Sequence, residues 1–128
     1  MKYTVKVSLC TIGINQINGE YNILSLESEN LILPFIEMNE STTIVSILEK
    51  LSSLHIDLDS NWIHYSIVGA IIDNSCQDKI EGGIDNLQTL LLLYRCIIPL
   101  DTKLINASWI PSWKCINNPL TQIILSSL

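Results

Sequence analysis

Apolar residues of the kind favoured in β-strands, Val5, Val7, Leu9 and Ile12, are interspersed with polar residues over residues 3–14, so this segment is expected to be a strand. The dipeptide Asn18-Gly19 separates this run from a second apolar run at 21–26. Asn-Gly between two such runs is a strong hairpin signal, because both residues accept the positive φ angle of a type I′ turn. The pattern therefore predicts an N-terminal β-hairpin closed by that turn.

The period changes to that of a helix after Pro34. A short extended piece at 31–33 ends at this proline, and the polar residues 39–43 provide an N-cap region. The apolar residues that follow are spaced i, i+3, i+4 and i+7, as in a helix that packs one face on a core. They are Ile44, Ile47, Leu48, Leu51 and Leu54. We expect this helix to end at 55–57.

The second half of the chain alternates between extended and polar stretches. Residues 62–72 are strand-like, and residues 73–85 are expected to form a polar loop. Residues 87–98 are almost continuously apolar, which is typical of a central strand that is covered on both faces. Residues 102–105 fit a turn or a strand, and residues 109–113 fit a strand end or a short turn.

A second helix is predicted at the end of the chain. Asn118 and Pro119 are favoured at the N-cap and at the first helical position. The apolar residues at helical spacing are Leu120, Ile123, Ile124 and Leu128. The element order is thus β-β-β-α-β-β-β-α. It predicts an α/β/α sandwich with a mixed sheet between helices, formed as one domain over residues 1–128.

Charged residues are scarce in this chain, and the few present are mainly acidic. They make up 16% of the 128 residues, against about 25% in an average globular protein. Seven Lys and Arg against 13 Asp and Glu give a net charge of −6. This balance excludes the basic surface needed for nucleic acid or for anionic lipid. A chain that is 48% hydrophobic is not disordered, and part of its apolar surplus suggests an interface in a homo-oligomer.

The sequence also indicates a reduced, cytoplasmic protein. No apolar secretory segment follows the first Lys, and the longest apolar stretch, 90–100, is too short to span a membrane. The cysteines are Cys10, Cys76, Cys96 and Cys115. None is in a C-x-x-C pair, which argues against a zinc site or a redox motif. Cys10 and Cys96 lie in apolar runs, where free cysteine behaves as a small buried hydrophobe.

The segment that begins at Leu33-Pro34 and continues through the first predicted helix resembles the Nudix box. That family's pattern is Leu-Pro-Gly-Gly, a Glu, Gly-Glu, seven spacers, Arg-Glu, an apolar residue, any residue, Glu-Glu, any residue, Gly and an apolar residue. Laid on this chain, Glu40 takes the loop Glu and residues 41–47 are the spacers. The remaining correspondences place Leu48-Glu49 at Arg-Glu, Lys50 at the apolar position, Ser52-Ser53 at Glu-Glu and His55-Ile56 at the closing pair.

Other letters are shared with the family pattern outside this core. Glu37 lies between the Leu-Pro and the loop Glu, and Trp109 resembles the family's recurring Trp before the last helix. The Gly-Gly is missing, and the loop to Glu40 is two residues short. The resemblance thus implies a Nudix-type fold over most of the chain, and it suggests Glu37, Ser52, Ser53 and Trp109 as ligand-binding positions.

The resemblance also implies what chemistry has been lost. In Nudix hydrolases three carboxylates on one helix face hold Mg²⁺, a hard cation that prefers oxygen ligands and substrate phosphates. Residues 49, 52 and 53 share one helix face, but only Glu49 carries a carboxylate there. Glu49 is thus the candidate catalytic and metal-binding residue, with Glu40 as a weaker catalytic candidate. Glu37, Asp57, Asp59 or an acid of the 73–85 loop would assist. The simpler alternative is that Glu49 is an ordinary exposed helix residue.

The sequence is therefore compatible with three classes of function. The first is a Nudix-like domain without standard Mg²⁺-dependent pyrophosphohydrolase activity, a pseudoenzyme that binds a nucleotide-type small molecule or a protein. The second is an active or weak Nudix hydrolase that uses Mg²⁺ and cleaves a nucleoside diphosphate linked to another group. The third is a structural or oligomeric subunit without a ligand.

Other candidate sites in the sequence are better explained without a function. His55 and His64 have no further ligand at metal-binding spacing, and Gly82-Gly83 is not followed by the Lys-Ser/Thr of a P-loop. The acids of the 73–85 loop do not match calcium-loop spacing. The tryptophans at 62, 109 and 113 are more often core residues than stacking platforms.

Overall fold

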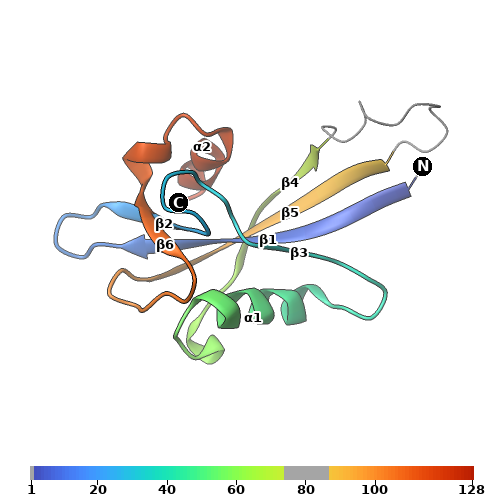
Figure 1. Ribbon diagram of the computed structural model, residues 1–128, viewed down its shortest axis with the longest axis horizontal. Coiled ribbons are helices and arrows are strands. Elements are labelled where there is room, and N and C mark those ends of the chain that lie inside the picture. The colour runs from blue at the N-terminus through green and yellow to red at the C-terminus, as the bar shows by residue number, and fades with distance from the viewer. Residues whose placement is uncertain (1, 74–86) are drawn as a thin grey trace.

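The computed structural model describes residues 2–73 and 87–128, and these residues form the predicted order of strands and helices (Figure 1). The elements are β1 (Lys2–Ile14), β2 (Tyr21–Ser25), β3 (Phe35–Glu37), α1 (Ile44–His55), η1 (Ser60–Trp62), β4 (Ser66–Asp73), β5 (Leu87–Pro99), β6 (Ser108–Pro111), η3 (Ser112–Cys115) and α2 (Pro119–Ser126). The helices α1 and α2 match the predicted ones closely. No helix among the described residues is both long and apolar enough to cross a membrane.

The six strands form one mixed sheet in the order β4-β5-β1-β2-β6, and β3 pairs with β1. β1 and β5 run parallel along the whole of β1, while the other pairs are antiparallel. The apolar run at 87–98 is therefore an inner strand, as predicted, flanked by β4 and β1. Its coverage is only partial, because Ile97 near its end is 46% exposed.

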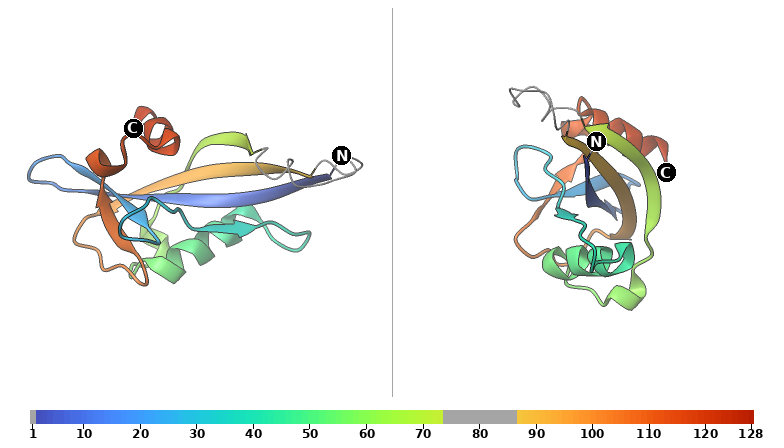
Figure 2. Two further views of the ribbon diagram at one scale, coloured as in Figure 1. Left: turned by 45° about the horizontal axis from the view of Figure 1, so that its top comes forward. Right: turned by 90° about the vertical axis from the view of Figure 1, so that its right-hand side faces the viewer.

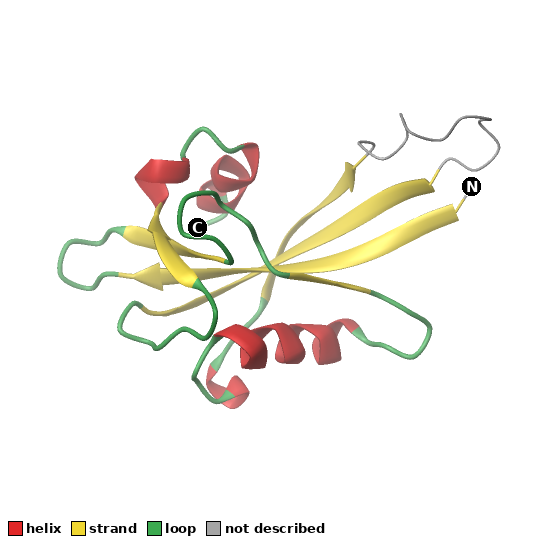
Figure 3. Ribbon diagram, in the orientation of Figure 1, coloured by secondary structure: helices red, strands yellow, loops and turns green. Residues whose placement is uncertain are grey.

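The two helices lie on opposite faces of the sheet (Figures 2 and 3). Alternation along β1 provides both faces with core residues: Val7 and Leu9 pack on the α1 side, while Cys10 and Ile12 pack with Ile124 of α2. The predicted α/β/α sandwich is confirmed. The cysteines at 10, 96 and 115 are buried and free, as expected for the first two.

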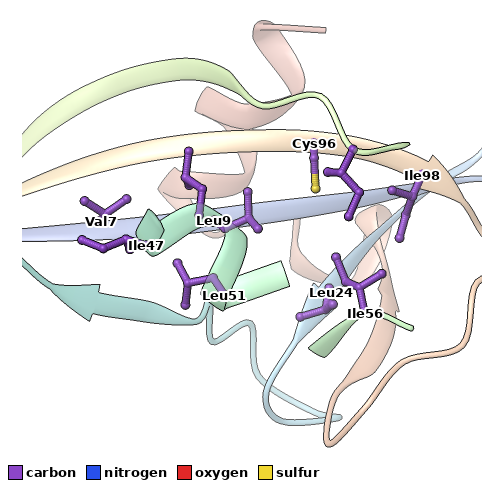
Figure 4. Packing of buried hydrophobic residues seen from close by; sticks show 10 residues of the cluster. Val7, Leu9, Leu24, Ile47, Leu51, Ile56, Cys96 and Ile98 are labelled. Atoms are coloured by element: carbon purple, nitrogen blue, oxygen red, sulfur yellow. The ribbon is translucent and has the colours of Figure 1, made fainter. Parts of the chain in front are cut away.

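Helix α1 is fixed to the sheet by a narrow buried stripe (Figure 4). Ile47, Leu48 and Leu51 are 2–3% exposed. The core residues that they join are Val7, Leu9, Leu24, Ile56, Ile63, Cys96 and Ile98. A capping box between Thr43 and Ser46 satisfies the first backbone N–H groups of the helix. The stripe therefore fixes which positions of α1 face inward and which face solvent.

Several local predictions were wrong for identifiable reasons. The hairpin between β1 and β2 forms, but its connection spans residues 15–20, and only Gly19 has a positive φ angle (+72°). The Asn18 side chain instead accepts a hydrogen bond from the backbone N–H of Glu20. The connection is therefore a longer loop that needs one left-handed residue, and a type I′ turn is not formed.

The other differences lie at the edges of elements. The extended piece expected at 31–33 is not a strand; β3 begins after Pro34, whose carbonyl accepts a hydrogen bond from the Ser8 hydroxyl (2.9 Å). The strand expected from residue 62 begins at Ser66, because Trp62 lies in η1 and is 75% exposed. A turn at 99–102 precedes residues 103–105, which are extended and form an isolated bridge between Leu104 and Ile56. Apart from Asp73, which ends β4, the predicted 73–85 loop lies outside the described residues.

Candidate functional site

The three positions of α1 that would carry metal-binding carboxylates do not share one environment. Glu49 and Ser53 are exposed, whereas Ser52 is 1% exposed. Ser52 belongs to the buried part of α1, together with Leu48 and Leu51. The structure therefore places one of the two serines inside the protein and the other on its surface.

The Ser52 hydroxyl is fully engaged where it lies. It donates a hydrogen bond to the backbone carbonyl of Glu49 (3.0 Å), and its oxygen is 2.7 Å from the phenol oxygen of Tyr65. Because the single hydroxyl proton of Ser52 is already used, Tyr65 donates to Ser52. Burial raises the pKa of Tyr65. The hydrogen bond with Ser52 partly offsets this effect and the nearby charge of Glu49 adds to it, so the phenol stays protonated.

Sequence analysis did not identify Tyr65 as the partner of Ser52. Tyr65 precedes β4, thirteen residues after Ser52, and the fold brings the two side chains together. The pattern of apolar residues gives no signal for this contact, because neither partner is an aliphatic core residue. A polar residue at a core position of an amphipathic helix was the one available sign that a partner existed.

The other acidic candidates lie elsewhere. Glu37 is opposite Lys6 in the pairing of β3 with β1. Its neighbour Ile36 packs toward the core beneath α1, so strand alternation directs Glu37 to the other face of the sheet. Glu40 is exposed in the turn before α1. Within residues 2–73 and 87–128, no three His, Cys, Asp or Glu residues are grouped as a metal site requires.

The residues present do not fit a magnesium site of the kind that the box implies. Mg²⁺ needs carboxylate oxygens in near-octahedral geometry. On α1 one carboxylate, that of Glu49, lies beside a buried hydroxyl. The Ser53 hydroxyl donates to the carbonyl of Lys50 (2.9 Å). The hydroxyl protons of both serines thus go to carbonyls of the helix itself.

The buried positions of α1 also test the alignment of the Nudix box pattern with the residues of this helix. Lys50, at the family's apolar position, is exposed, while the next residue, Leu51, is 2% exposed. Shifting the box by one residue sets Leu51 at the apolar position and Lys50 at the Glu of Arg-Glu. Ser53 and Leu54 then fall at Glu-Glu. In either register the Glu-Glu pair has no carboxylate.

Trp109 is a half-buried packing residue. Its ring lies over Gly13 of β1, where an added Cβ would be 2.8 Å from the ring carbon Cη2. The same side chain packs against the core beneath α1. Much of the indole surface is thus already covered by the protein, which leaves less of it for a ligand.

We expect Gly13→Ala to lower the free energy of unfolding by about 1–3 kcal/mol, because the new methyl group overlaps the Trp109 ring. Urea denaturation measures this loss. Gly69→Ala is the matched control, since nothing lies within 4 Å of a Cβ at Gly69. An equal loss in both variants would mean that the Trp109 contact is not the cause.

Two of the hollows on the surface of the described residues are candidate ligand sites, and neither is lined by Glu49 or Trp109. The first, about 600 Å³, lies between the β1–β2 loop and the end of β5. Its lining residues include Ile14, Gln16, Pro99 and Asp101. The second, about 200 Å³, lies on the α2 side of the sheet, beside Lys6 and Phe35. The Lys6 ammonium sits 4.7 Å from the centre of the Phe35 ring.

The sequence alone matches no protein-family model and no curated protein. Solved structures do match. The Nudix domain of Shewanella oneidensis NrtR, crystallised with ADP ribose, superimposes with a TM-score of 0.67 at 10% identity, over 99% of this chain and 89% of that one. A MutT/Nudix family protein of Listeria innocua gives 0.57 at 13% identity, over 98% and 92%. The C. elegans Ap4A hydrolase gives 0.58 at 9% identity, over 96% and 94%.

These likenesses cover almost the whole chain at very low sequence identity. They show that the chain has the Nudix fold, and they confirm at the level of the fold the resemblance found in the sequence. Activity does not follow from a shared fold, because activity depends on the residues at the site.

Proposed function

We propose that this chain is a Nudix-fold domain without the standard Mg²⁺-dependent pyrophosphohydrolase activity, and that it binds a nucleotide-type ligand. The observation that supports this proposal best is the state of position 52. In the register read from the sequence, a serine takes the place of a metal-binding Glu, lies in the core and is hydrogen-bonded to Tyr65 and to its own helix. In the shifted register the Glu-Glu pair is Ser53-Leu54, which also has no carboxylate.

The chemistry of pyrophosphate cleavage explains why this matters. The metal polarises the phosphate oxygens and lowers the pKa of the attacking water. A single exposed carboxylate, Glu49, offers too little negative charge to hold Mg²⁺ there without the substrate. The remaining role of such a fold is to bind a ligand, or a partner, without cleaving it.

The proposed ligand class is a nucleoside diphosphate joined to a second group. One structural neighbour, the Nudix domain of NrtR, was crystallised with ADP ribose, which belongs to this class. ADP-ribose is therefore the first compound to test. The alternative of a weak hydrolase with displaced ligands rests on the exposed carboxylates of Glu40 and Glu49, with Mg²⁺ as its cofactor.

Isothermal titration calorimetry with ADP-ribose tests the binding proposal. We expect binding whose dissociation constant changes by less than about twofold between excess Mg²⁺ and excess EDTA, because no protein-held metal bridges the phosphates. Glu49→Gln should bind equally well. No heat of binding at millimolar ADP-ribose and related nucleoside diphosphate compounds would contradict the ligand assignment, and binding that requires Mg²⁺ and Glu49 would favour the hydrolase alternative.

A further inference from the structure

Lys6 is the one charged residue among the described residues that line the second hollow, on the α2 side of the sheet. This hollow has a volume of about 200 Å³. Two hydroxyl-bearing residues also line it, and its apolar lining residues are Leu33, Phe35, Leu91 and Leu120. A few polar groups set among apolar side chains are typical of a site for a small molecule. The ammonium of Lys6 therefore decides which class of ligand this hollow attracts.

The contact that the structure shows for the Lys6 ammonium does not neutralise it. Lys6 is half-buried, whereas lysine is mostly exposed in proteins. Its Nζ lies 4.7 Å from the centre of the Phe35 ring, and a ring face attracts a cation without carrying a net charge. No carboxylate among the described side chains forms a salt bridge with Lys6. The positive charge of Lys6 is therefore available to an anionic ligand.

Glu37 opposes an anion at this hollow only weakly. It lies opposite Lys6 in the pairing of β3 with β1, and residues that face one another in this way project to the same side of the sheet. Its side chain is exposed, and it is not among the residues that line the hollow. Solvent and salt therefore screen the repulsion between Glu37 and a bound anion.

A nucleoside diphosphate needs a positive partner in this chain. The net charge is −6, so the protein as a whole repels anions. The described residues of α1 do not form the group of carboxylates that would hold Mg²⁺ against the phosphates. A lysine ammonium is a compact cation with three donors, and it binds phosphate oxygens through charge-assisted hydrogen bonds. Lys6 can thus provide charge that the missing metal does not.

We infer that the second hollow binds the diphosphate part of the ligand, and that Lys6 supplies the positive charge that Mg²⁺ supplies in Nudix hydrolases. This inference rests on the proposed function, because that function takes a nucleoside diphosphate as the ligand. The hollow is smaller than the roughly 300–1,000 Å³ of a whole ligand pocket, so the rest of the ligand extends out of it. The Phe35 ring lies against the ammonium and limits its contact with water, which strengthens its attraction for phosphate.

Isothermal titration calorimetry in EDTA tests this inference with two probes, inorganic diphosphate and ADP-ribose. We expect Lys6→Gln to weaken the binding of both at least about tenfold, because a charge-assisted hydrogen bond to phosphate is lost. Glu37→Gln should strengthen binding about twofold, since it removes the negative charge opposite Lys6.

Lys114→Gln is the matched control, because it changes the net charge equally. The Lys114 ammonium also lies over a ring, 5.6 Å from the centre of Trp113, but Lys114 does not line the hollow. Its affinities should equal those of the unsubstituted chain. Far-UV circular dichroism establishes that each variant is folded. In two-dimensional NMR spectra, inorganic diphosphate should shift the amide signals of residues 6–8 and 89–91 most.

The outcomes separate this inference from the proposed function. Binding of ADP-ribose that Lys6→Gln weakens no more than Lys114→Gln would overturn the inference and leave the proposed function standing. Binding of inorganic diphosphate that depends on Lys6, without binding of ADP-ribose, would support Lys6 as the phosphate-binding cation and contradict the proposed ligand. If neither probe binds the folded chain, both the inference and the proposed ligand are wrong.

Discussion

We expect Ser52→Glu to lower the free energy of unfolding by about 3–5 kcal/mol, although this change restores a letter of the Nudix box. Ser52 is 1% exposed, and its hydroxyl is held between the Glu49 carbonyl and the Tyr65 phenol. A glutamate there loses both contacts, adds one methylene group to a packed region and replaces the hydroxyl with a larger carboxylate that lies away from water. Burial of an unpaired charge is among the largest single-residue penalties known.

The pH dependence separates the charge from the packing. Burial raises the pKa of the new carboxyl, so at neutral pH the unfolded state is ionised more readily than the folded state. The loss in free energy of unfolding caused by Ser52→Glu should be largest near neutral pH. It should shrink as the pH falls to about 4, near the ordinary pKa of Glu. The loss in free energy of unfolding that remains at about pH 4 measures the cost of overpacking.

Ser53→Glu is the matched control, because Ser53 is the exposed neighbour on the same helix. We expect its effect on the free energy of unfolding to stay within about 0.5 kcal/mol. Urea denaturation measures both variants. A Ser52→Glu protein as stable as the Ser53→Glu protein would mean that position 52 reaches solvent, and the account of the buried serine would fail.

Leu48→Arg should have an effect of similar size, about 3–5 kcal/mol. The alignment of the Nudix box made from the sequence places its arginine at position 48. Leu48, however, is 3% exposed in the core beneath α1. Neighbours such as Leu9 and Leu51 offer a guanidinium no acceptor. The substitution therefore replaces core packing with an unpaired cation.

Leu54→Arg serves as the comparison, because Leu54 lies in the same helix and is 47% exposed. Its cost should be about 1 kcal/mol or less. Thermal or urea unfolding of the pair gives the difference directly. If both arginines cost the same, the inward face of α1 is not the stripe that contains Leu48.

The fold could be predicted from the sequence because its main signals are local. The spacing of Ile44, Ile47, Leu48 and Leu51 reflects the face that α1 buries, and the Asn118-Pro119 pair sets the start of α2. Leu54 and Ile123 have the same periodicity yet are partly exposed, since spacing does not show where the core ends. The hairpin turn was missed because the loop uses Asn18 as a side-chain acceptor and only Gly19 as a left-handed residue.

The candidate site was less predictable than the fold. Sequence reasoning located Glu49 and the neutral residues beside it, but it placed Ser52 and Ser53 together on one outward face. The apolar pattern does not count serine as a core residue, so the only sign of the inward position of Ser52 was its helical spacing of four residues from Leu48. Its partner Tyr65 is a tertiary contact. Glu37 is separated from Glu49 by strand alternation, which can be assigned only when the register of β3 with β1 is known.

Hydrolysis is the most direct test of the central claim, that α1 no longer supports Mg²⁺-dependent pyrophosphate cleavage. Purified protein is incubated with ADP-ribose and other nucleoside diphosphate derivatives in millimolar Mg²⁺ or Mn²⁺, and the products are separated by chromatography. The account predicts no product above the protein-free rate, and the same result for Glu49→Gln. Metal-dependent turnover that Glu49→Gln abolishes would contradict it.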